Sequence, residues 1–315
     1  MCDKSLLPRP SFCVAERRGS LRSRTWLFYA IVTTLFWGLW GALIELPEKA
    51  GFPATLGYSV WALTMIPPCL VALKAIRWAL ERDRRSVVLG LVIGLTGAGG
   101  QLVLFQALRM GPAYLVFPII SLSPVVTVIL SYLLLRERTS RRGWLGIVLA
   151  LFAIPLLSYQ PPTGQGAASS SWWLVLSLLV FLAWGFQAYV MKFANETMKA
   201  ESIFFYMTIT GLMLVPVAVL MTDFSQPVNW GFKGPYLAAL IQTLNAVGAL
   251  CLVFALRYGK AIIVSPLTNA VAPVITVVLS LSLYRVIPHS AALAGMILAL
   301  SAAFLLAIEE EPGQA

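Results

Sequence analysis

The amino-acid sequence predicts an all-α integral membrane protein whose ten transmembrane helices form two inverted five-helix repeats. Three observations predict this fold: charges are scarce, long charge-free windows recur along the chain, and the second half resembles the first. Of the 315 residues, 59% are hydrophobic and 11% are charged, whereas a soluble protein has about 25% charged residues. So few charges cannot cover the surface of a soluble protein of this length.

The charge-free windows set the number of spans, because a bilayer-spanning helix needs about 20 residues with few or no charges. The nine windows are 25–44, 50–73, 86–108, 110–135, 143–191, 202–222, 234–256, 261–284 and 286–308. Eight of them are one span long, and the window 143–191 is about twice that length. Its middle is rich in Pro, Gly and Ser, which predicts a turn that cannot cross hydrocarbon unpaired. That window therefore holds two spans, and the total is ten.

The basic residues predict the orientation of these spans. Alternate connections, beginning with the N-terminal tail, hold 19 of the Lys and Arg residues, and the other connections hold 4. The positive-inside rule then places both termini in the cytoplasm, in a multi-pass protein of the cytoplasmic (inner or plasma) membrane. The net charge of +10 follows from this asymmetry, so we expect the basic residues to contact the lipid bilayer and not nucleic acid.

The two halves of the chain are similar in sequence. Residues 106–118 match 254–266 at seven of thirteen positions, and 124–136 match 273–285 at eight of thirteen. Each half carries five predicted spans, and five is odd, so the second copy enters the membrane from the opposite side. The predicted organisation is a cytoplasmic basic tail (1–24), a first repeat (25–159), an external linker (160–171), a second repeat (172–308) and a cytoplasmic acidic tail (309–315).

Inverted repeats are typical of secondary transporters, because two near-equivalent halves can exchange conformations around a site near the midplane. The alternatives are a duplication that only enlarges a helix bundle, a polytopic membrane enzyme, and a non-transporting membrane subunit. A single histidine, His289, and spans without an acidic cluster disfavour acid–base catalysis and metal binding. We therefore expect a carrier of a small molecule, with no enzyme activity, cofactor or metal.

Two motifs carry a resemblance to a known family. Trp-Gly pairs occur in the first span of each half, at 37–38 and 184–185, and both halves carry the run Ala-Leu-Arg-x-Gly-x-Ala-x-x-Val-x-Pro. These features resemble the drug/metabolite transporter superfamily, in its EamA-like ten-helix branch, over residues 26–308. The resemblance implies a carrier of amino acids, other metabolites, nucleotide sugars or drugs. The acidic residue that commonly follows the fourth helix of a repeat is present as Glu137 but replaced by Val286 in the second copy.

Candidate substrate-binding residues are the polar and aromatic ones nearest the middle of each span, because polar atoms in hydrocarbon are costly unless they are paired or face water. They are Trp37, Gln101, Ser121, Trp184, Gln187, Asn245 and Asn269. The resemblance implies that their helices surround a central cavity. The alternatives are hydrogen bonding between helices for the amides and packing for the indoles. No charge lies near a midplane, which predicts a polar substrate that is neutral or zwitterionic, such as an amino acid.

Four residues are candidates for gating or coupling. Glu45 and Lys192 occupy equivalent positions of the two repeats, and inverted symmetry places them at opposite faces of the membrane. The alternative for both is a boundary charge that reaches toward water. Pro124 and Pro273 also pair across the repeats, and each is expected to remove a helix hydrogen bond and so to assist bending.

Overall fold

The computed structural model describes residues 25–110, 116, 119–120, 122–158, 172–284 and 290–308. Regular structure within these ranges is helical, and no strand occurs among them. The α-helices are α2 (Thr25–Leu43), α3 (Glu45–Lys49), α4 (Ala54–Thr64), α5 (Ile66–Ala75), α6 (Arg84–Gly94), α7 (Gly100–Met110), α9 (Ser123–Leu133), α10 (Arg141–Ser158), α11 (Trp172–Ala194), α12 (Ala200–Met213), α13 (Val215–Leu220), α14 (Leu237–Tyr258), α15 (Ala261–Tyr284) and α16 (Ser290–Ala307). Two π-helical turns, Leu95–Gly99 and Phe232–Tyr236, precede α7 and α14. The expected tails 1–24 and 309–315 and the expected linker 160–171 lie outside the described residues.

Six helical segments are long and apolar enough to cross a membrane. They are Thr25–Lys49, Ala54–Ala75, Arg84–Met110, Trp172–Ala194, Ala200–Leu220 and Phe232–Tyr258, with further apolar helices of shorter length. Large apolar side chains on these segments, such as Phe28, Leu95 and Leu220, are exposed. Exposed apolar surface on this scale suits lipid and not water, so the prediction of an all-helical membrane protein is confirmed.

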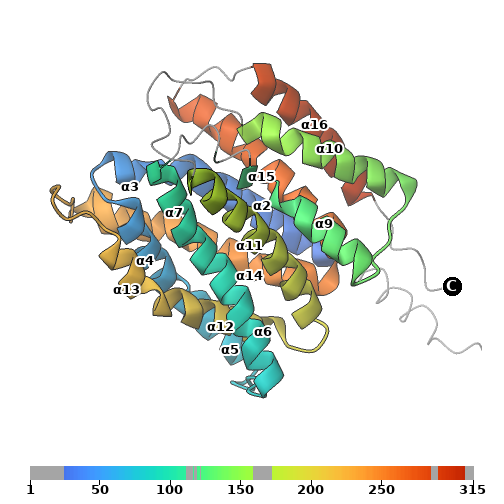
Figure 1. Cartoon of the computed structure of the whole chain (residues 1–315), viewed down its shortest axis with the longest axis horizontal. Coiled ribbons are helices and arrows are strands. Elements are labelled where there is room, and N and C mark those ends of the chain that lie inside the picture. The colour runs from blue at the N-terminus through green and yellow to red at the C-terminus, as the bar shows by residue number, and fades with distance from the viewer. Residues whose placement is uncertain are drawn as a thin grey trace, which may run out of the picture.

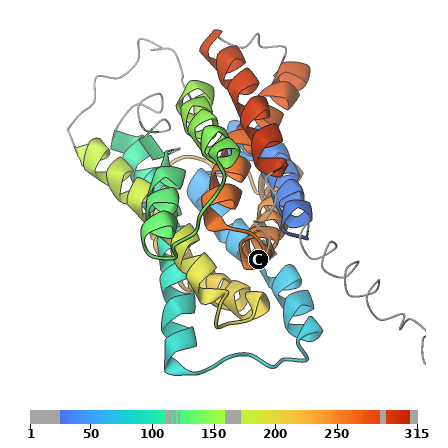
Figure 2. The same cartoon turned by 90° about the vertical axis from the view of Figure 1, so that its right-hand side faces the viewer.

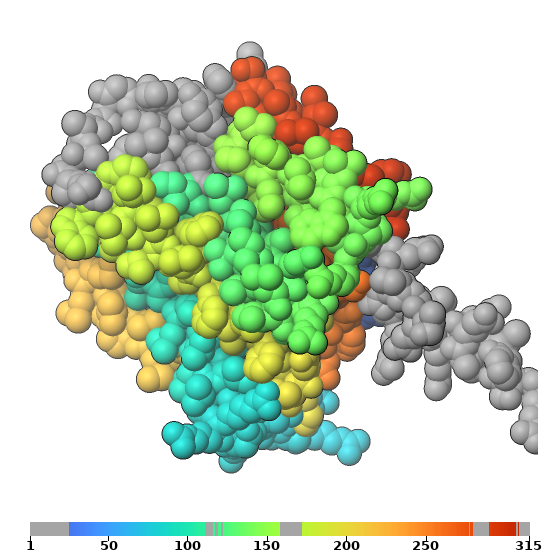
Figure 3. All heavy atoms as spheres, turned by 45° about the vertical axis from the view of Figure 1, so that its right-hand side comes forward, coloured from blue at the N-terminus to red at the C-terminus, as the bar shows by residue number. Residues whose placement is uncertain are grey.

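The two halves of the chain interleave and do not form separate bundles (Figure 1). The first-half helix α2 packs on α14 and α15, and the second-half helix α11 packs on α7 and α9. The helices α10 and α16 also pack on each other, and Figure 2 shows this pair from the side. The surface in Figure 3 accordingly has green first-half segments beside yellow and red second-half segments. Each half therefore completes the packing of the other.

Glycines on α2 and α11 allow this close approach. Thr276 Oγ1 of α15 donates a hydrogen bond to the carbonyl of Gly38 (3.0 Å), and Thr127 Oγ1 of α9 donates one to the carbonyl of Gly185 (2.9 Å). A Cβ atom added at Gly38 would lie 2.5 Å from Cβ of Ile275, and one at Gly185 would be crowded in the same way. The same contact is thus made twice, at positions that the sequence repeat makes equivalent.

Prolines divide several of the helices. The break between α4 and α5 falls just before Pro67, and the break between α12 and α13 falls just before Pro216. Pro124 likewise lies in the first turn of α9, whereas Pro273 lies inside α15. A proline in a first turn removes no intrahelical hydrogen bond. The expected loss of a helix hydrogen bond therefore applies to Pro273 and is wrong for Pro124.

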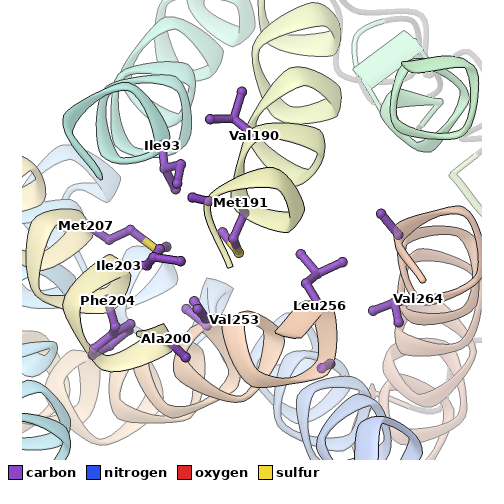
Figure 4. Close-up of a cluster of buried hydrophobic side chains, with 14 of the residues drawn as sticks. Ile93, Val190, Met191, Ala200, Ile203, Phe204, Met207, Val253, Leu256 and Val264 are labelled. Carbon is purple, nitrogen blue, oxygen red and sulfur yellow. The ribbon is translucent and has the colours of Figure 1, made fainter. Parts of the chain in front are cut away.

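The main apolar core lies where helices of both halves meet (Figure 4). Ile93 of α6, Met191 of α11 and Phe204 of α12 are almost completely buried there, together with Val253 of α14 and Val264 of α15. Dispersion contacts and lipid entropy stabilise such packing in a bilayer, because hydrocarbon is as apolar as these side chains. Close fit therefore matters more here than burial of apolar area.

The glycine contacts predict a selective loss of stability. Gly38→Ala and Gly185→Ala should each lower the thermal unfolding temperature of the purified protein by several degrees, because overpacking costs about 1–3 kcal/mol. Gly99→Ala is the matched control, since a Cβ there would have no heavy atom within 4 Å. Unfolding temperatures for Gly38→Ala and Gly185→Ala equal to that of Gly99→Ala would contradict the close approach.

Candidate functional site

One seam of the candidate site runs between α2 and α14, which three hydrogen bonds join. They run from Thr33 Oγ1 to the carbonyl of Gly248 (3.1 Å), from Trp37 Nε1 to the carbonyl of Asn245 (3.4 Å) and from Trp40 Nε1 to Oε1 of Gln242 (3.0 Å). The donors are spaced three or four residues apart, so they lie along one face of α2. Both indoles are therefore turned toward the second half of the chain.

The second seam lies on α11 and repeats one of these contacts. Trp184 Nε1 donates a hydrogen bond to the carbonyl of Gly97 (3.2 Å) in the π-helical turn before α7. Gly97 and Asn245 are equivalent positions of the two repeats, so Trp37 and Trp184 make the same contact in different halves. The Gln187 amide also lies against Gly97. The structure thus brings the predicted residues into two groups, Trp37 with Asn245 and Trp184 with Gln187.

The side-chain amides of the predicted substrate-binding residues differ in their hydrogen bonding. Asn269 Nδ2 donates to the carbonyl of Ser265 (2.9 Å), one turn earlier on α15. In the described part of the chain no hydrogen bond is found for the side-chain amides of Gln101, Gln187 and Asn245, all of which are partly buried. Ser121, the remaining predicted residue, lies outside the described residues.

Sequence reasoning missed the pair formed by Trp40 and Gln242. Gln242 is 5% exposed, and its Oε1 satisfies the Trp40 indole across the α2–α14 seam. A signal was present, because Trp40 follows Trp37 by three residues and Gln242 precedes Asn245 by three, which places each pair on one helix face. Selection of candidates by depth in the span alone leaves out both Trp40 and Gln242.

The two charged gating candidates have different partners. Glu45 Oε2 lies 2.6 Å from Lys49 Nζ, and these side chains are 62% and 60% exposed. Lys192 Nζ donates to the carbonyl of Gly259 (2.7 Å) and lies 4.0 Å from Oε1 of Glu137. The pair at Glu45 lies within one helical turn, whereas the contact at Lys192 joins the two halves.

A pocket of about 540 Å³ opens at the Glu45 end of the molecule. Its lining residues are Leu46, Lys49, Ala50, Asn229, Lys233 and Leu237. None of the predicted substrate-binding residues lines it. The two seams and this pocket are therefore separate features.

Glu137 caps the start of α15 from the turn between α9 and α10. Its Oε1 accepts a hydrogen bond from the N–H of Ala261 (3.1 Å) and its Oε2 accepts one from the N–H of Ile262 (2.9 Å). These are the first two N–H groups of α15, which have no partner within the helix and carry the positive end of its dipole. The Glu137 side chain is 8% exposed, so one first-half carboxylate anchors a second-half helix in a nearly buried position.

The charge state of Glu137 depends on this burial. Burial raises the pKa of the Glu137 carboxyl, and the Ile262 N–H, Lys192, the Ala261 N–H and Lys260 act to lower it, with burial the larger effect. The buried position therefore favours the protonated form of this carboxyl more than bulk water would.

Further contacts join the turns at the same end of the molecule. We call this end, formed by the turns 76–83, 134–140, 195–199 and 259–260, the basic end. Its ties include Lys260 Nζ to the carbonyl of Arg138 (2.8 Å), Lys199 Nζ to Oε1 of Glu81 (3.5 Å) and Arg257 Nη1 to the carbonyl of Met198 (2.9 Å). Ser202 Oγ also donates to Glu81. Across the two halves, these contacts join turn 134–140 to turn 259–260 and turn 76–83 to turn 195–199, and Arg257 at the end of α14 adds a contact within the second half.

Comparisons with known proteins agree with this architecture. A solved crystal structure with 17% sequence identity superposes with a TM-score of 0.70, covering 89% of this chain and 98% of that one, which shows a shared fold. An uncharacterized protein of Methanocaldococcus jannaschii is 33% identical over 90 residues, covering 29% of this chain and 66% of that protein. The model of the EamA-like transporter family matches twice, at residues 24–159 and 171–308. Because these matches span most of the chain in two copies, the protein belongs to the EamA-like transporter family.

Proposed function

We propose that the protein is a secondary transporter that moves a small polar metabolite, neutral or zwitterionic, such as an amino acid, by alternating access. Family membership supports a membrane transporter of small molecules. The observation that carries the mechanism is the contact made twice, Thr276 to Gly38 and Thr127 to Gly185. Two halves with the same contacts can exchange conformations with little change in energy, which is what alternating access requires.

In this proposal the chain crosses the cytoplasmic membrane ten times as two inverted repeats, with both termini in the cytoplasm. The helices α9, α10, α15 and α16 supply the spans beyond the six long segments. The basic end then faces the cytoplasm, in keeping with its Arg and Lys residues. The pocket at Lys49 faces the opposite compartment.

The substrate in this proposal binds between the two seams. Trp37 and Trp184 offer indole faces, and Gln101, Gln187 and Asn245 offer amides that make no hydrogen bond within the described residues. Asn269 and Ser121 complete the proposed set. Charged residues in the described helices lie near helix ends, and a carrier selecting on net charge would keep a counter-charge deeper. This supports a substrate without net charge.

The proposed gating residues make none of the hydrogen bonds of the seams. Lys192 joins α11 to Glu137 of the first half, and Pro273 lies inside α15, which packs on α2. Pro124 starts α9, which packs on α11. Glu45 remains in the proposed gating set as a charged residue at the end of the molecule opposite to Lys192. Movement of α9 and α15 against their partners would open the two ends in turn.

Purified protein in liposomes provides the test of transport. Amino acids and other small metabolites are first screened for thermal stabilisation, because a ligand at 100 times its Kd stabilises the native state by about 2.7 kcal/mol. Flux of a radiolabelled hit should then be present with the parent protein and lost with Asn245→Leu. The Trp37 hydrogen bond goes to the backbone of Asn245, so the unfolding temperature should stay unchanged. Normal flux in Asn245→Leu would remove this residue from the site.

Gln242→Leu is the matched contrast on the same helix. Its side chain accepts the Trp40 indole N–H in a buried position, so the substitution leaves a donor without an acceptor and should cost about 1–3 kcal/mol of stability. Thermal unfolding should therefore separate Gln242→Leu, which is destabilised, from Asn245→Leu, which is not. Equal unfolding temperatures for the two variants would show that the hydrogen bond from Trp40 to Gln242 does not contribute to stability.

Cysteine labelling in intact cells tests the orientation. In a background without the native cysteines, Thr197→Cys at the basic end should react with an impermeant maleimide only after the membrane is permeabilised. Ser225→Cys should react in intact cells. Both positions are exposed, and the helices α12 and α13 between them span about 30 Å at 1.5 Å per residue. The reverse pattern at both positions would overturn the proposed orientation.

A further inference from the structure

Two carboxylates of the first half contact residues of the second half at the basic end. Glu137 accepts the first two N–H groups of α15 and lies 4.0 Å from Lys192 of α11. Glu81, in the link between α5 and α6, lies 3.5 Å from Lys199 at the start of α12. Glu137 is the more buried of the two, with 8% of its side chain exposed against 23% for Glu81.

The opposite end of the molecule is joined differently. The corresponding link of the second repeat, which follows α13, carries Asn229, whose Nδ2 donates to the carbonyl of Ala50 in the first half (2.8 Å). This contact between the halves is made by a neutral side chain. The repeat equivalent of Glu137 is Val286, which has no acceptor atom in its side chain. Among the described residues, the carboxylate–lysine contacts within 4.0 Å that join the two halves lie at the basic end.

Glu137 lies in a turn between two helices that both pack on α15. These helices are α9 and α10, and α15 also packs on α2, while α9 also packs on α11. In the proposed transport cycle, a solute leaving the seams through the basic end passes between the first turn of α15 and the turn that carries Glu137. That path separates the first turn of α15 from Glu137 and leaves two helix N–H groups without this acceptor.

We propose that Glu137 is the latch that holds the basic end closed, by capping the first turn of α15, and that Lys192 positions its carboxylate. The proposal rests on the transport function proposed above, because only a carrier needs this end to open. It also makes the two ends unequal, since the second repeat carries Val286 in place of the acid. The state closed at the basic end is then the favoured resting state.

The test reads opening directly, without a transported solute. The reporter is Ser265→Cys, which lies one turn into α15 and replaces a side chain that is 4% exposed. Native Cys69, 5% exposed in the main core, is retained as a reporter of unfolding, and the other native cysteines are replaced. A charged maleimide is added to the detergent-purified protein, and the labelling rate at each position is measured by mass spectrometry.

Glu137→Ala should raise the labelling rate at position 265 about tenfold, because loss of a capping side chain shifts such an equilibrium by roughly that factor. Glu137→Gln keeps one acceptor oxygen and should give a smaller rise. Glu196→Ala is the matched control, since Glu196 is an exposed acid at the same end, and it should leave the rate unchanged. Labelling at position 69 should stay slow in all three variants.

Two outcomes would overturn the latch. One is a labelling rate at position 265 in Glu137→Ala equal to that in Glu196→Ala. The other is parallel labelling of positions 265 and 69 in both Glu137→Ala and Glu137→Gln, which would make Glu137 a general structural residue. Failure of the transport proposal gives a different result from failure of the latch. If no solute shows flux, the transport proposal fails, whereas the labelling rates still report whether Glu137 holds the basic end closed. If flux is normal and Glu137→Ala does not change the labelling rate at position 265, only the latch proposal fails.

Discussion

The close approach of α2 and α11 to helices of the opposite half is the contact on which the rest of the structure depends. At Gly38 and Gly185 no side chain separates the backbones, so threonine hydroxyls of the neighbouring helices reach the glycine carbonyls directly. With these helices seated, Trp37 and Trp184 point into the seams and reach their carbonyl acceptors. A bulkier residue at either glycine would move the helix and the indole together.

The interleaving also explains why the two ends of the molecule can differ while part of the middle stays symmetric. The repeat retains Trp37 and Trp184, and both indoles reach backbone carbonyls at equivalent positions, so this contact recurs in both halves. The ends are built from turns, where a single replacement changes a carboxylate into an amide or an alkyl group. Glu81 and Asn229 illustrate this, because they lie in corresponding links of the two repeats and each contacts the other half, one with a carboxylate and one with an amide.

Much of the fold followed from the sequence, because the bilayer restricts where charges can lie. The helical class, the long apolar spans and the twofold repetition were all predicted from charge-free windows and self-similarity. The exchange of α2 and α11 between halves was not predicted, since a sequence repeat says nothing about which copy a helix packs against. Among the site residues, depth in the predicted span was enough to select Asn245. It did not select the buried pair of Trp40 and Gln242, because predicting that pair requires knowing that α2 and α14 face each other.

The exchange of α2 has a consequence for synthesis of the chain. Thr33 contacts Gly248, which follows it by 215 residues, and at about 5–20 residues per second this partner emerges roughly 10–40 seconds later. During that interval α2 is in the membrane without the helices that cover its polar face. Early lipid or insertase contacts therefore have to shield the Thr33, Trp37 and Trp40 face until the last third of the protein arrives.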